Sequence, residues 1–183
     1  MISKIDELRL IARCVTLDDH RAFARLVDEY SPGLRRFVYN LTLGDASLTD
    51  DISQETFIKA YISLRSFRGL SRFSTWLYTI ACREYADYRR RNARTVSLDP
   101  ATTAADLDTG YSTPHRASDI HHDLEVAMSC LSEHERMAVL LFYLEDRPIK
   151  DISRITGMPE GTIKSHLSRA KSKMAQTINE YES

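Results

Sequence analysis

Apolar residues recur at steps of three and four on both sides of one long polar segment, and this period leaves the α-helix as the main element that the chain can build. Before that segment, for example, Phe23, Leu26, Val27 and Tyr30 fall on one helical face. No run shows the strict alternation of a half-buried strand. The sequence therefore predicts an all-α fold.

The polar segment 95–117 is rich in Thr, Ser, Asp and Ala, contains two prolines and lacks a hydrophobic period. Such a composition is typical of a flexible linker. A chain of 183 residues can form one or two domains of about 100 to 200 residues each. We expect two small helical domains, over 1–94 and 118–183, joined by this linker.

Cap signals divide the first domain into five helices. The first covers Lys4–Cys14, Asp18 caps the second, Ser31-Pro32 starts a third that stops at Gly44, Ser47 or Thr49 opens the fourth, and the fifth runs from about Ser74 to about Arg91. The apolar residues of the fourth helix, Ile58 among them, are expected to face a core. Its side chains Asp51, Gln54 and Glu55 project together, which on the pattern alone indicates an ordinary solvated face.

The second domain carries a helix-turn-helix pattern. Ser118 and Ser132 can each cap a helix, and Ser132 with Glu135 forms a capping box ahead of an apolar run. A short helix with three isoleucines then leads through Gly157-Met158-Pro159 into a longer basic helix that begins at Glu160. This arrangement predicts binding in the major groove of DNA, with a plain helical hairpin as the alternative.

The formal net charge of −1 hides a segregation of charge along the chain. Arg65–Arg94 contains eight arginines against two acidic residues, 96–136 is acidic, and Arg147–Lys173 is basic again. Aromatic residues alternate with the arginines of Phe67–Arg94; arginine binds phosphates and aromatic rings stack on bases, so this segment suits an unpaired strand. Two nucleic-acid contact surfaces are therefore predicted.

No motif indicates an enzyme. The sequence has no Ser-His-Asp order, phosphate loop or carboxylate pair, and His121, His122, Cys130 and His134 lack the spacing of a zinc site, so we predict no metal and no cofactor. Cys82 is expected to be a packed residue rather than a redox sensor. No apolar run approaches the roughly 20 residues of a spanning helix, and a cytoplasmic chain is expected.

These motifs together resemble bacterial RNA polymerase sigma factors of the extracytoplasmic function (ECF) group, which contain only the second and fourth sigma regions. DDISQETFIKAY is similar to the core-binding helix of that family, FRGLSRFSTWLYTIA to its promoter-melting segment, and LSEHERMAVLLFYLEDRPIKDISRITGMPEGTIKSHLSRAKSKM to its fourth region. The resemblance covers most of residues 20–175 and leaves out the linker. It implies a non-enzymatic protein that gives core polymerase its promoter specificity.

The resemblance also implies three sets of site residues, and it turns the polar face of the fourth helix from a solvated surface into a polymerase contact. Docking on the clamp helices of the largest polymerase subunit would involve Asp51, Gln54, Glu55 and Phe57. The minus-ten element would contact Phe67, Arg68, Ser71, Arg72, Phe73, Trp76, Arg83, Asp87, Arg90 and Arg91, with an extruded base held by the loop Phe67–Phe73 and Trp76 packed beneath it. The minus-thirty-five element would contact Glu160, Thr162, Lys164, Ser165, His166, Arg169 and Lys173.

The chain departs from the family at two of these positions. Arg83 stands where the family usually has Asn, which exchanges a base-reading amide for a cation. His166 stands where Arg is frequent in the recognition helix, which predicts a weaker and pH-sensitive phosphate contact.

The partners that the resemblance implies are core RNA polymerase (clamp helices and flap), promoter DNA and an anti-sigma factor, which in this group is often bound to the inner membrane. Two alternatives belong to other classes. A helix-turn-helix transcription regulator would bind duplex DNA without replacing the sigma subunit, and a nucleic-acid enzyme with a helical DNA-binding tail would need a catalytic constellation.

Overall fold

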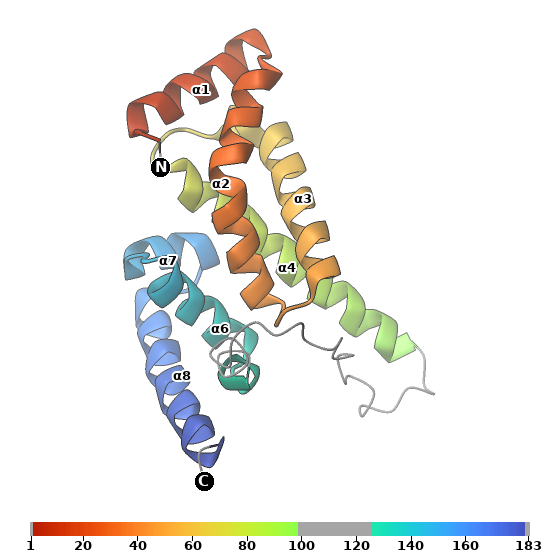
Figure 1. Ribbon diagram of the computed structural model, residues 1–183, viewed down its shortest axis with the longest axis vertical. Helices are drawn as coiled ribbons and strands as arrows, with labels where there is room; N and C mark the ends of the chain where they lie inside the picture. Colours follow the sequence, from red (N-terminus) through yellow and green to blue (C-terminus); the bar gives the residue numbers. More distant parts are fainter. Residues whose placement is uncertain (1, 99–125, 182–183) are drawn as a thin grey trace.

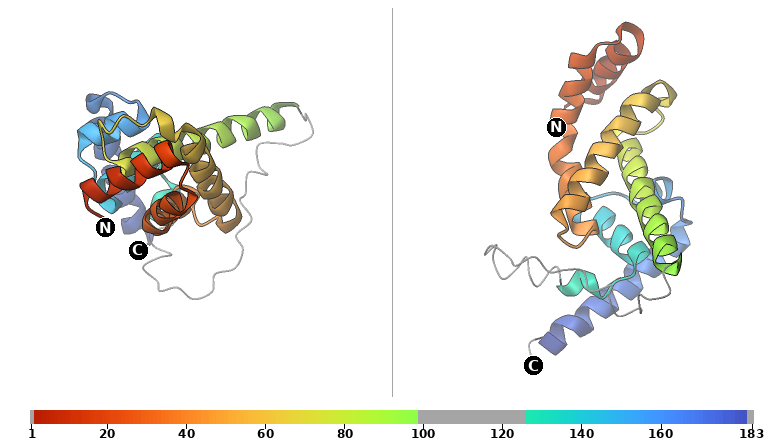
Figure 2. Two further views of the ribbon diagram at one scale, coloured as in Figure 1. Left: turned by 90° about the horizontal axis from the view of Figure 1, so that it is seen from above. Right: turned by 90° about the vertical axis from the view of Figure 1, so that its right-hand side faces the viewer.

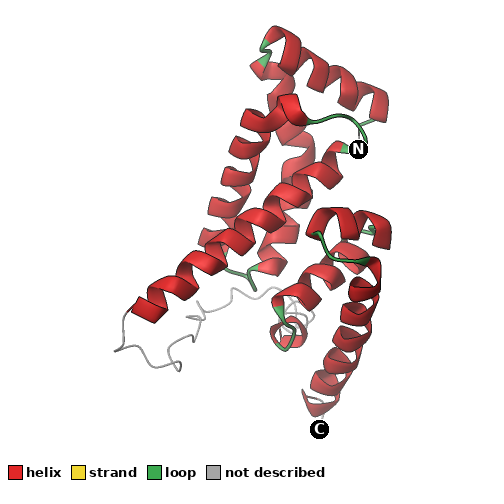
Figure 3. Ribbon diagram, turned by 180° about the vertical axis from the view of Figure 1, so that it is seen from behind, coloured by secondary structure: helices red, strands yellow, loops and turns green. Residues whose placement is uncertain are grey.

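The computed structural model describes residues 2–98 and 126–181, and within these ranges every regular element is a helix (Figure 1, Figure 3). The first part contains α1 (Lys4–Leu17), α2 (His20–Leu41), α3 (Ala46–Ser63), the 3₁₀ turn η1 (Leu64–Ser66) and α4 (Phe73–Leu98). The second contains α6 (Glu133–Val139), the π-helical turn η2 (Leu140–Leu144), α7 (Ile149–Thr156) and α8 (Glu160–Tyr181). The all-α prediction is confirmed.

Helices α2, α3 and α4 pack against one another, and α1 lies across one end of α2 (Figure 1, Figure 2). Leu26, Leu34, Phe37 and Leu77 are completely buried between them. The salt bridge from Lys59 on α3 to the buried Glu84 on α4, at 2.6 Å, joins the two helices beside this core. The bundle therefore holds α3 and α4 in a fixed relation, with one face of each exposed.

The expected break at Ser31-Pro32 is wrong, because α2 runs through Pro32 without ending. Proline in a helix interior costs about 3 kcal/mol, since it lacks the N–H that the ladder needs. On both sides of Pro32, however, Leu26, Leu34 and Phe37 are fully buried, and each such side chain stabilises the fold by about 1.5–3 kcal/mol. Burial of this long apolar face outweighs the missing hydrogen bond.

Two helix starts also differ from the expectation. Asp19, not Asp18, caps α2 by accepting from the backbone N–H groups of Arg21 and Ala22, while Asp18 adopts a left-handed conformation at the end of α1. Asp45, not Ser47 or Thr49, caps α3 by accepting from Leu48 N at 2.9 Å. In both turns several residues could serve as caps, and the position at which the preceding helix ends selects the one that does.

The ends of α2 and α4 complete the first part. Helix α2 ends at Leu41, and positive φ angles at Leu43 (56°) and Gly44 (84°) turn the chain toward α3. Helix α4 continues to Leu98, beyond the expected end near Arg91. Residues 99–125, which include Ser118 and most of the expected linker, lie outside the described residues.

The second part forms the expected helix-turn-helix. The capping box of Ser132 and Glu135 starts α6, with both reciprocal hydrogen bonds present. Helix α7 ends at Gly157, whose φ of 75° is the left-handed conformation that favours glycine, and α8 follows. Ile152, Ile155, Ile163 and Ala170 are buried at the contact of these helices.

The two parts are packed directly against each other, with α7 against α4 and α6 against α2. The Glu145 carboxylate accepts hydrogen bonds from the Tyr78 hydroxyl (2.5 Å) and the Arg36 guanidinium (2.9 Å). Arg147 donates to Ser74 Oγ at 3.1 Å and lies over the Tyr78 ring, 5.1 Å from its centroid. Burial, together with the hydrogen bond to Glu145, raises the pKa of Tyr78, so its hydroxyl remains a donor at neutral pH.

A buried arginine reinforces this contact. Arg136 of α6 donates to three main-chain carbonyls, those of Leu41 (3.0 Å), Leu131 (3.2 Å) and Met128 (3.3 Å). Because Leu41 is the last residue of α2, the guanidinium ties the two parts together. Within residues 2–98 and 126–181, no helix is both long and apolar enough to cross a membrane.

Candidate nucleic-acid and protein interfaces

The loop before α4 rests on a cluster of three aromatic rings. The centroids of Phe67 and Phe73 are 5.8 Å apart, those of Phe67 and Trp76 5.4 Å, and those of Phe73 and Trp76 5.6 Å. Phe73 is fully buried, whereas Phe67 and Trp76 are half-buried. Phe73 therefore forms the floor of the cluster, and the other two rings present partly open surfaces on which a flat group can stack.

Above these rings the loop is shaped by Gly69, whose φ of +67° is unfavourable for residues with a side chain. Next to it, Leu70 is 84% exposed. Arg68 and Arg72 are also exposed, and Ser71 is half-buried. The loop thus places two cations beside a partly open aromatic surface, which is the combination that binds a single strand.

Helix α4 extends from this loop as a charged surface. Arg83, Arg90 and Arg91 are exposed, and the half-buried Asp87 forms an ion pair with Arg90. On the opposite side Cys82 is buried, and burial raises the pKa of its thiol to about 12. A thiol in this state is unreactive at neutral pH, so Cys82 is a packing residue, as predicted.

Helix α3 presents a mixed polar and apolar face. Asp51, Gln54 and Glu55 are exposed, while Phe57 is half-buried against the core. The expectation that Ile58 faces the core is wrong, because it is 44% exposed; Ile62, one turn further on, is 74% exposed. Positions 51, 54, 55, 58 and 62 have the spacing of one helical face, so the two isoleucines lie on the same exposed face as the polar side chains.

Helix α8 exposes Glu160, Lys164 and Ser165 in its first turns and half-buries Thr162, while Ile163 between them anchors the helix in the core. The N-terminal turns of such a helix are the part that contacts base edges in a helix-turn-helix. Glu160, Lys164 and Ser165 are thus exposed on the surface of α8.

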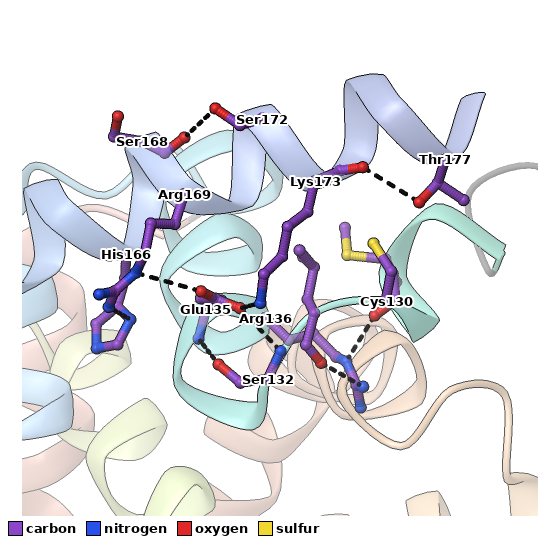
Figure 4. A network of polar contacts seen from close by, with 12 residues as sticks. Cys130, Ser132, Glu135, Arg136, His166, Ser168, Arg169, Ser172, Lys173 and Thr177 are labelled. Carbon is purple, nitrogen blue, oxygen red and sulfur yellow. Dashed lines mark hydrogen bonds and ion pairs between the residues drawn. The ribbon is translucent and has the colours of Figure 1, made fainter. Parts of the chain in front are cut away.

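The later basic residues of α8 contact α6 (Figure 4). The Glu135 carboxylate forms salt bridges with Lys173 at 2.8 Å and with Arg169 at 3.4 Å. The ring of His166 stacks on that of His134 with the ring centroids 5.9 Å apart. Arg169 also lies 3.0 Å from Nδ1 of His166. These contacts hold α8 against α6.

Burial alone would raise the pKa of the Glu135 carboxyl, but hydrogen bonds from Lys173 and from Ser132 outweigh it and hold the pKa at about 2. Partial burial, followed by the nearby Arg169 and His134, lowers the pKa of His166. His166 is therefore mainly neutral at pH 7 and contributes little positive charge to the surface of α8.

An apolar groove of about 440 Å³ lies between η2 and α8, a feature that sequence reasoning missed. Its lining consists of Met128, Val139, Leu140, Tyr143, Leu144, Lys171, Met174 and Ala175. Tyr143 is 65% exposed. The apolar run 137–144 could have indicated this groove, because it contains more apolar residues than one buried helical face can hold.

Three further features were missed because they depend on tertiary contacts. These are the Glu145 network between the two parts, the buried Arg136 and the buried Glu7. Among the described residues, no group of three or more His, Cys, Asp or Glu side chains is arranged to hold a metal, and His121 and His122 lie outside that range.

Comparisons with known proteins agree with this geometry. Residues 26–95 match the family model of sigma-70 region 2, and residues 121–174 match that of sigma-70 region 4. The RNA polymerase sigma-H factor of Pseudomonas aeruginosa is 31% identical over 181 residues, with 93% of each chain covered. The ECF RNA polymerase sigma-E factor of Haemophilus influenzae is 31% identical over 191 residues, covering 97% of this chain and 98% of that one.

Two solved structures are similar in fold. The sigma factor RpoE in complex with the anti-sigma factor NepR from Bartonella quintana has a TM-score of 0.74 and 26% identity, covering 86% of this chain and 96% of that chain. The structure of CnrH in complex with the cytosolic domain of CnrY has a TM-score of 0.69 at 19% identity, covering 95% and 97%, and supports the fold alone.

Proposed function

The chain belongs to the ECF RNA polymerase sigma factors, and on that premise we propose which of its surfaces bind the core enzyme, the promoter and the anti-sigma factor. It directs promoter-specific initiation under the control of an anti-sigma factor, and sigma factors are not an enzyme class. The alternative of a regulator that leaves the sigma subunit in place is disfavoured, because both sigma regions match in order.

The single observation that carries the promoter assignment is the aromatic cluster beneath the arginine-bearing loop. Phe67 and Trp76 would hold an extruded base of the minus-ten element, on the floor formed by Phe73. Extruding a base costs a few kcal/mol. Stacking on aromatic rings returns about 1–3 kcal/mol per base, so the two half-buried rings supply an amount of the required size.

The charged residues around the cluster would position the strand. Arg68, Ser71 and Arg72 border the open rings, and the exposed face of α4 carries Arg83, Asp87, Arg90 and Arg91 toward the upstream edge of the element. Because Arg83 replaces the amide usual in the family, it favours phosphate or guanine contact over reading of adenine.

Helix α8 would read the minus-thirty-five element in the major groove. Its first turns carry Glu160, Thr162, Lys164 and Ser165 as candidates for base and phosphate contacts. His166, Arg169 and Lys173 would act at the edge of that contact; their ion pairs and ring stacking with α6 support the orientation of the helix.

Core polymerase would bind the mixed face of α3, through Asp51, Gln54, Glu55 and Phe57, with Ile58 and Ile62 adding apolar contact area. A patch in which apolar side chains stand among polar ones is typical of a protein interface. The clamp helices of the largest subunit are the proposed partner here, and the polymerase flap would contact the second domain.

The anti-sigma factor is the proposed occupant of the apolar groove between η2 and α8. A groove lined by Met128, Tyr143 and Met174 fits the apolar face of an amphipathic helix. The similar RpoE structure contains an anti-sigma factor, which supports a partner of this kind. An anti-sigma factor bound to the inner membrane would hold the chain there until the signal releases it.

Run-off transcription with purified core polymerase tests the proposal. Duplex and pre-melted promoter fragments are supplied in a library, with and without the protein. We expect sequence-dependent initiation to occur only when the protein is present, and we expect more transcript from the melted fragments than from the duplex ones. Failure to bind core polymerase, together with tight binding to duplex DNA alone, would contradict it and favour the regulator.

A further inference from the structure

Helix α1 lies outside the matched sigma-70 region 2, yet it contacts the loop that carries the proposed base pocket. The side chain of Leu8 comes within 3.5 Å of the position that a Cβ atom would take on Gly69. The carboxylate of Glu7, one residue earlier, accepts a hydrogen bond from the backbone N–H of Phe73 at 3.1 Å. The N-terminal helix therefore supports both the tip and the end of this loop.

Glu7 is a buried carboxylate with only 1% of its surface exposed. Burial of a charge is costly unless the group is hydrogen-bonded, and Glu7 has two donors. One carboxylate oxygen accepts from Phe73 N, and the other accepts a hydrogen bond from the Tyr30 hydroxyl. Glu7 thus places a buried carboxylate at the start of α4. Packing of the core alone would not require a charged group at this position.

The position of Phe73 explains what this contact achieves. Phe73 is the first residue of α4, and its N–H is one of the four at a helix start that have no partner within the helix. Glu7 satisfies it from a different helix, and its negative charge also complements the positive end of the α4 dipole. Tyr30, the second hydrogen-bond donor to Glu7, packs on the Phe73 ring with the ring centroids 5.3 Å apart.

Phe73 is in turn the floor on which Phe67 and Trp76 rest. Glu7 holds the main chain of Phe73 directly, and it holds Tyr30, whose ring packs on the Phe73 ring. The carboxylate therefore fixes both the first residue of α4 and the position of the Phe73 ring beneath Phe67 and Trp76. We infer that Glu7 is a positioning residue for the extruded-base pocket, acting through Phe73 and Tyr30 without touching DNA. This inference rests on the proposed promoter function of the loop.

The test measures base preference, which a merely structural role would not change. Holoenzyme is assembled from core polymerase and each variant, and its affinity is compared for two fork-junction promoters that differ only at the extruded position, one with the base and one abasic. The ratio of the two affinities does not depend on the fraction of active protein. We expect Glu7→Ala to reduce this ratio at least five-fold.

Glu7→Gln should keep the ratio within about two-fold of wild type, because its amide oxygen can still accept from Phe73 N. Arg9→Ala is the matched control and should not change the ratio, because Arg9 lies on the exposed face of the same helix and pairs with the exposed Asp6 at 3.5 Å. Core affinity should stay unchanged in all three variants, because α3 carries that contact.

A wild-type ratio in a folded Glu7→Ala variant would overturn the inference. Circular dichroism establishes whether that variant folds; if it does not, Tyr30→Phe decides, since it removes one donor from Glu7 and retains the ring. An unchanged ratio in Tyr30→Phe then overturns the inference equally. Failure of the proposed function is distinct from both outcomes, because wild-type holoenzyme would then show no preference for the base.

Discussion

Phe67 and Phe73 belong to one loop and one ring cluster, but they differ in burial and therefore in their expected roles. Phe73 is fully buried and contacts Tyr30, Phe67 and Trp76, whereas Phe67 keeps an open face. A side chain that is already surrounded by protein cannot stack on a base. The proposed contact with DNA thus falls to Phe67 and Trp76.

Substitution of the two phenylalanines should separate stability from promoter opening. Phe73→Ala should destabilise the fold by about 3–5 kcal/mol, because it leaves a cavity in the core. Phe67→Ala should change stability far less and should weaken binding to a melted minus-ten strand by about 1–3 kcal/mol through lost stacking. Chemical denaturation and strand-binding titrations measure the two effects. Equal destabilisation by both variants would contradict this division.

Glu135 predicts a pH dependence of the second domain. Its pKa in the folded protein, about 2, lies below the ordinary value of 4.5, so the folded state favours the ionised carboxylate. The stabilisation is present above pH 4.5 and is lost as the pH falls from 4.5 to about 2. Glu135→Gln should therefore lower the Tm at pH 7, and the difference from wild type should shrink through this window.

Thermal unfolding between pH 7 and pH 2 measures that difference, with Glu160→Gln on the exposed start of α8 as the control. The control removes only an exposed charge from the first turn of α8, so it should change the Tm at pH 7 far less than Glu135→Gln does. A gap between wild type and Glu135→Gln that stays constant down to the lowest pH would show that the carboxylate does not provide this stabilisation.

At the scale of the element, α3 combines a face that packs in the core with the face proposed to bind core polymerase. Ile52, Thr56 and Ala60 are buried, while Ile58 and Ile62 stand among the exposed polar residues. Covering an exposed apolar side chain with a partner protein stabilises the complex by about 25 cal/mol for each Å² of apolar surface buried. If core polymerase covers this face as proposed, the exposed isoleucines would strengthen that binding without stabilising the free protein.

Ile62→Lys should weaken binding to core polymerase about ten-fold while leaving the free energy of unfolding nearly unchanged. The side chain is 74% exposed, so little packing is lost. Leu17→Lys on α1 is the matched control, because Leu17 is 72% exposed and lies outside the proposed interface. Fluorescence titration with labelled core enzyme gives both affinities. Equal affinity of the two variants would exclude Ile62 from the interface.

At the scale of the whole molecule, the direct packing of the two parts constrains promoter recognition. Elements centred near minus ten and minus thirty-five lie about 25 base pairs apart, or roughly 85 Å along B-DNA. A domain of about 100 residues has a radius of gyration of only about 13 Å. Two such domains in contact cannot reach both elements, so the contact between them must open before both are bound.

Glu145→Ala should favour the open arrangement, because it removes the acceptor shared by Tyr78 and Arg36. Loss of a buried hydrogen-bond partner costs about 1–3 kcal/mol, which shifts the equilibrium about five-fold or more toward separation. Fluorescence transfer between labels on α3 and α8 should fall. Asp146→Asn, an exposed neighbour with a φ of 49° that Asn tolerates, is the control. Unchanged transfer in Glu145→Ala would contradict the prediction.

Much of the fold was predictable because its signals are local. The period of apolar residues, the capping box of Ser132 and Glu135, and Gly157 in the turn each act within a few positions, and all three are confirmed. The motif order indicated the family that the comparisons found. The nucleic-acid surface indicated by the alternation of aromatics and arginines stays a prediction.

The chain by itself thus determined its all-α class, its helix-turn-helix and its family, since these follow from hydrogen bonding and burial within short windows. Only the tertiary structure decided that α2 continues through Pro32, that Ile58 faces outward, that Phe73 is a floor rather than a stacking surface, and that Glu145 joins the two parts. The reason is that each of these depends on which distant element covers a side chain. Glu7 and Phe73, which are separated by 66 positions, meet only when α1 crosses the bundle.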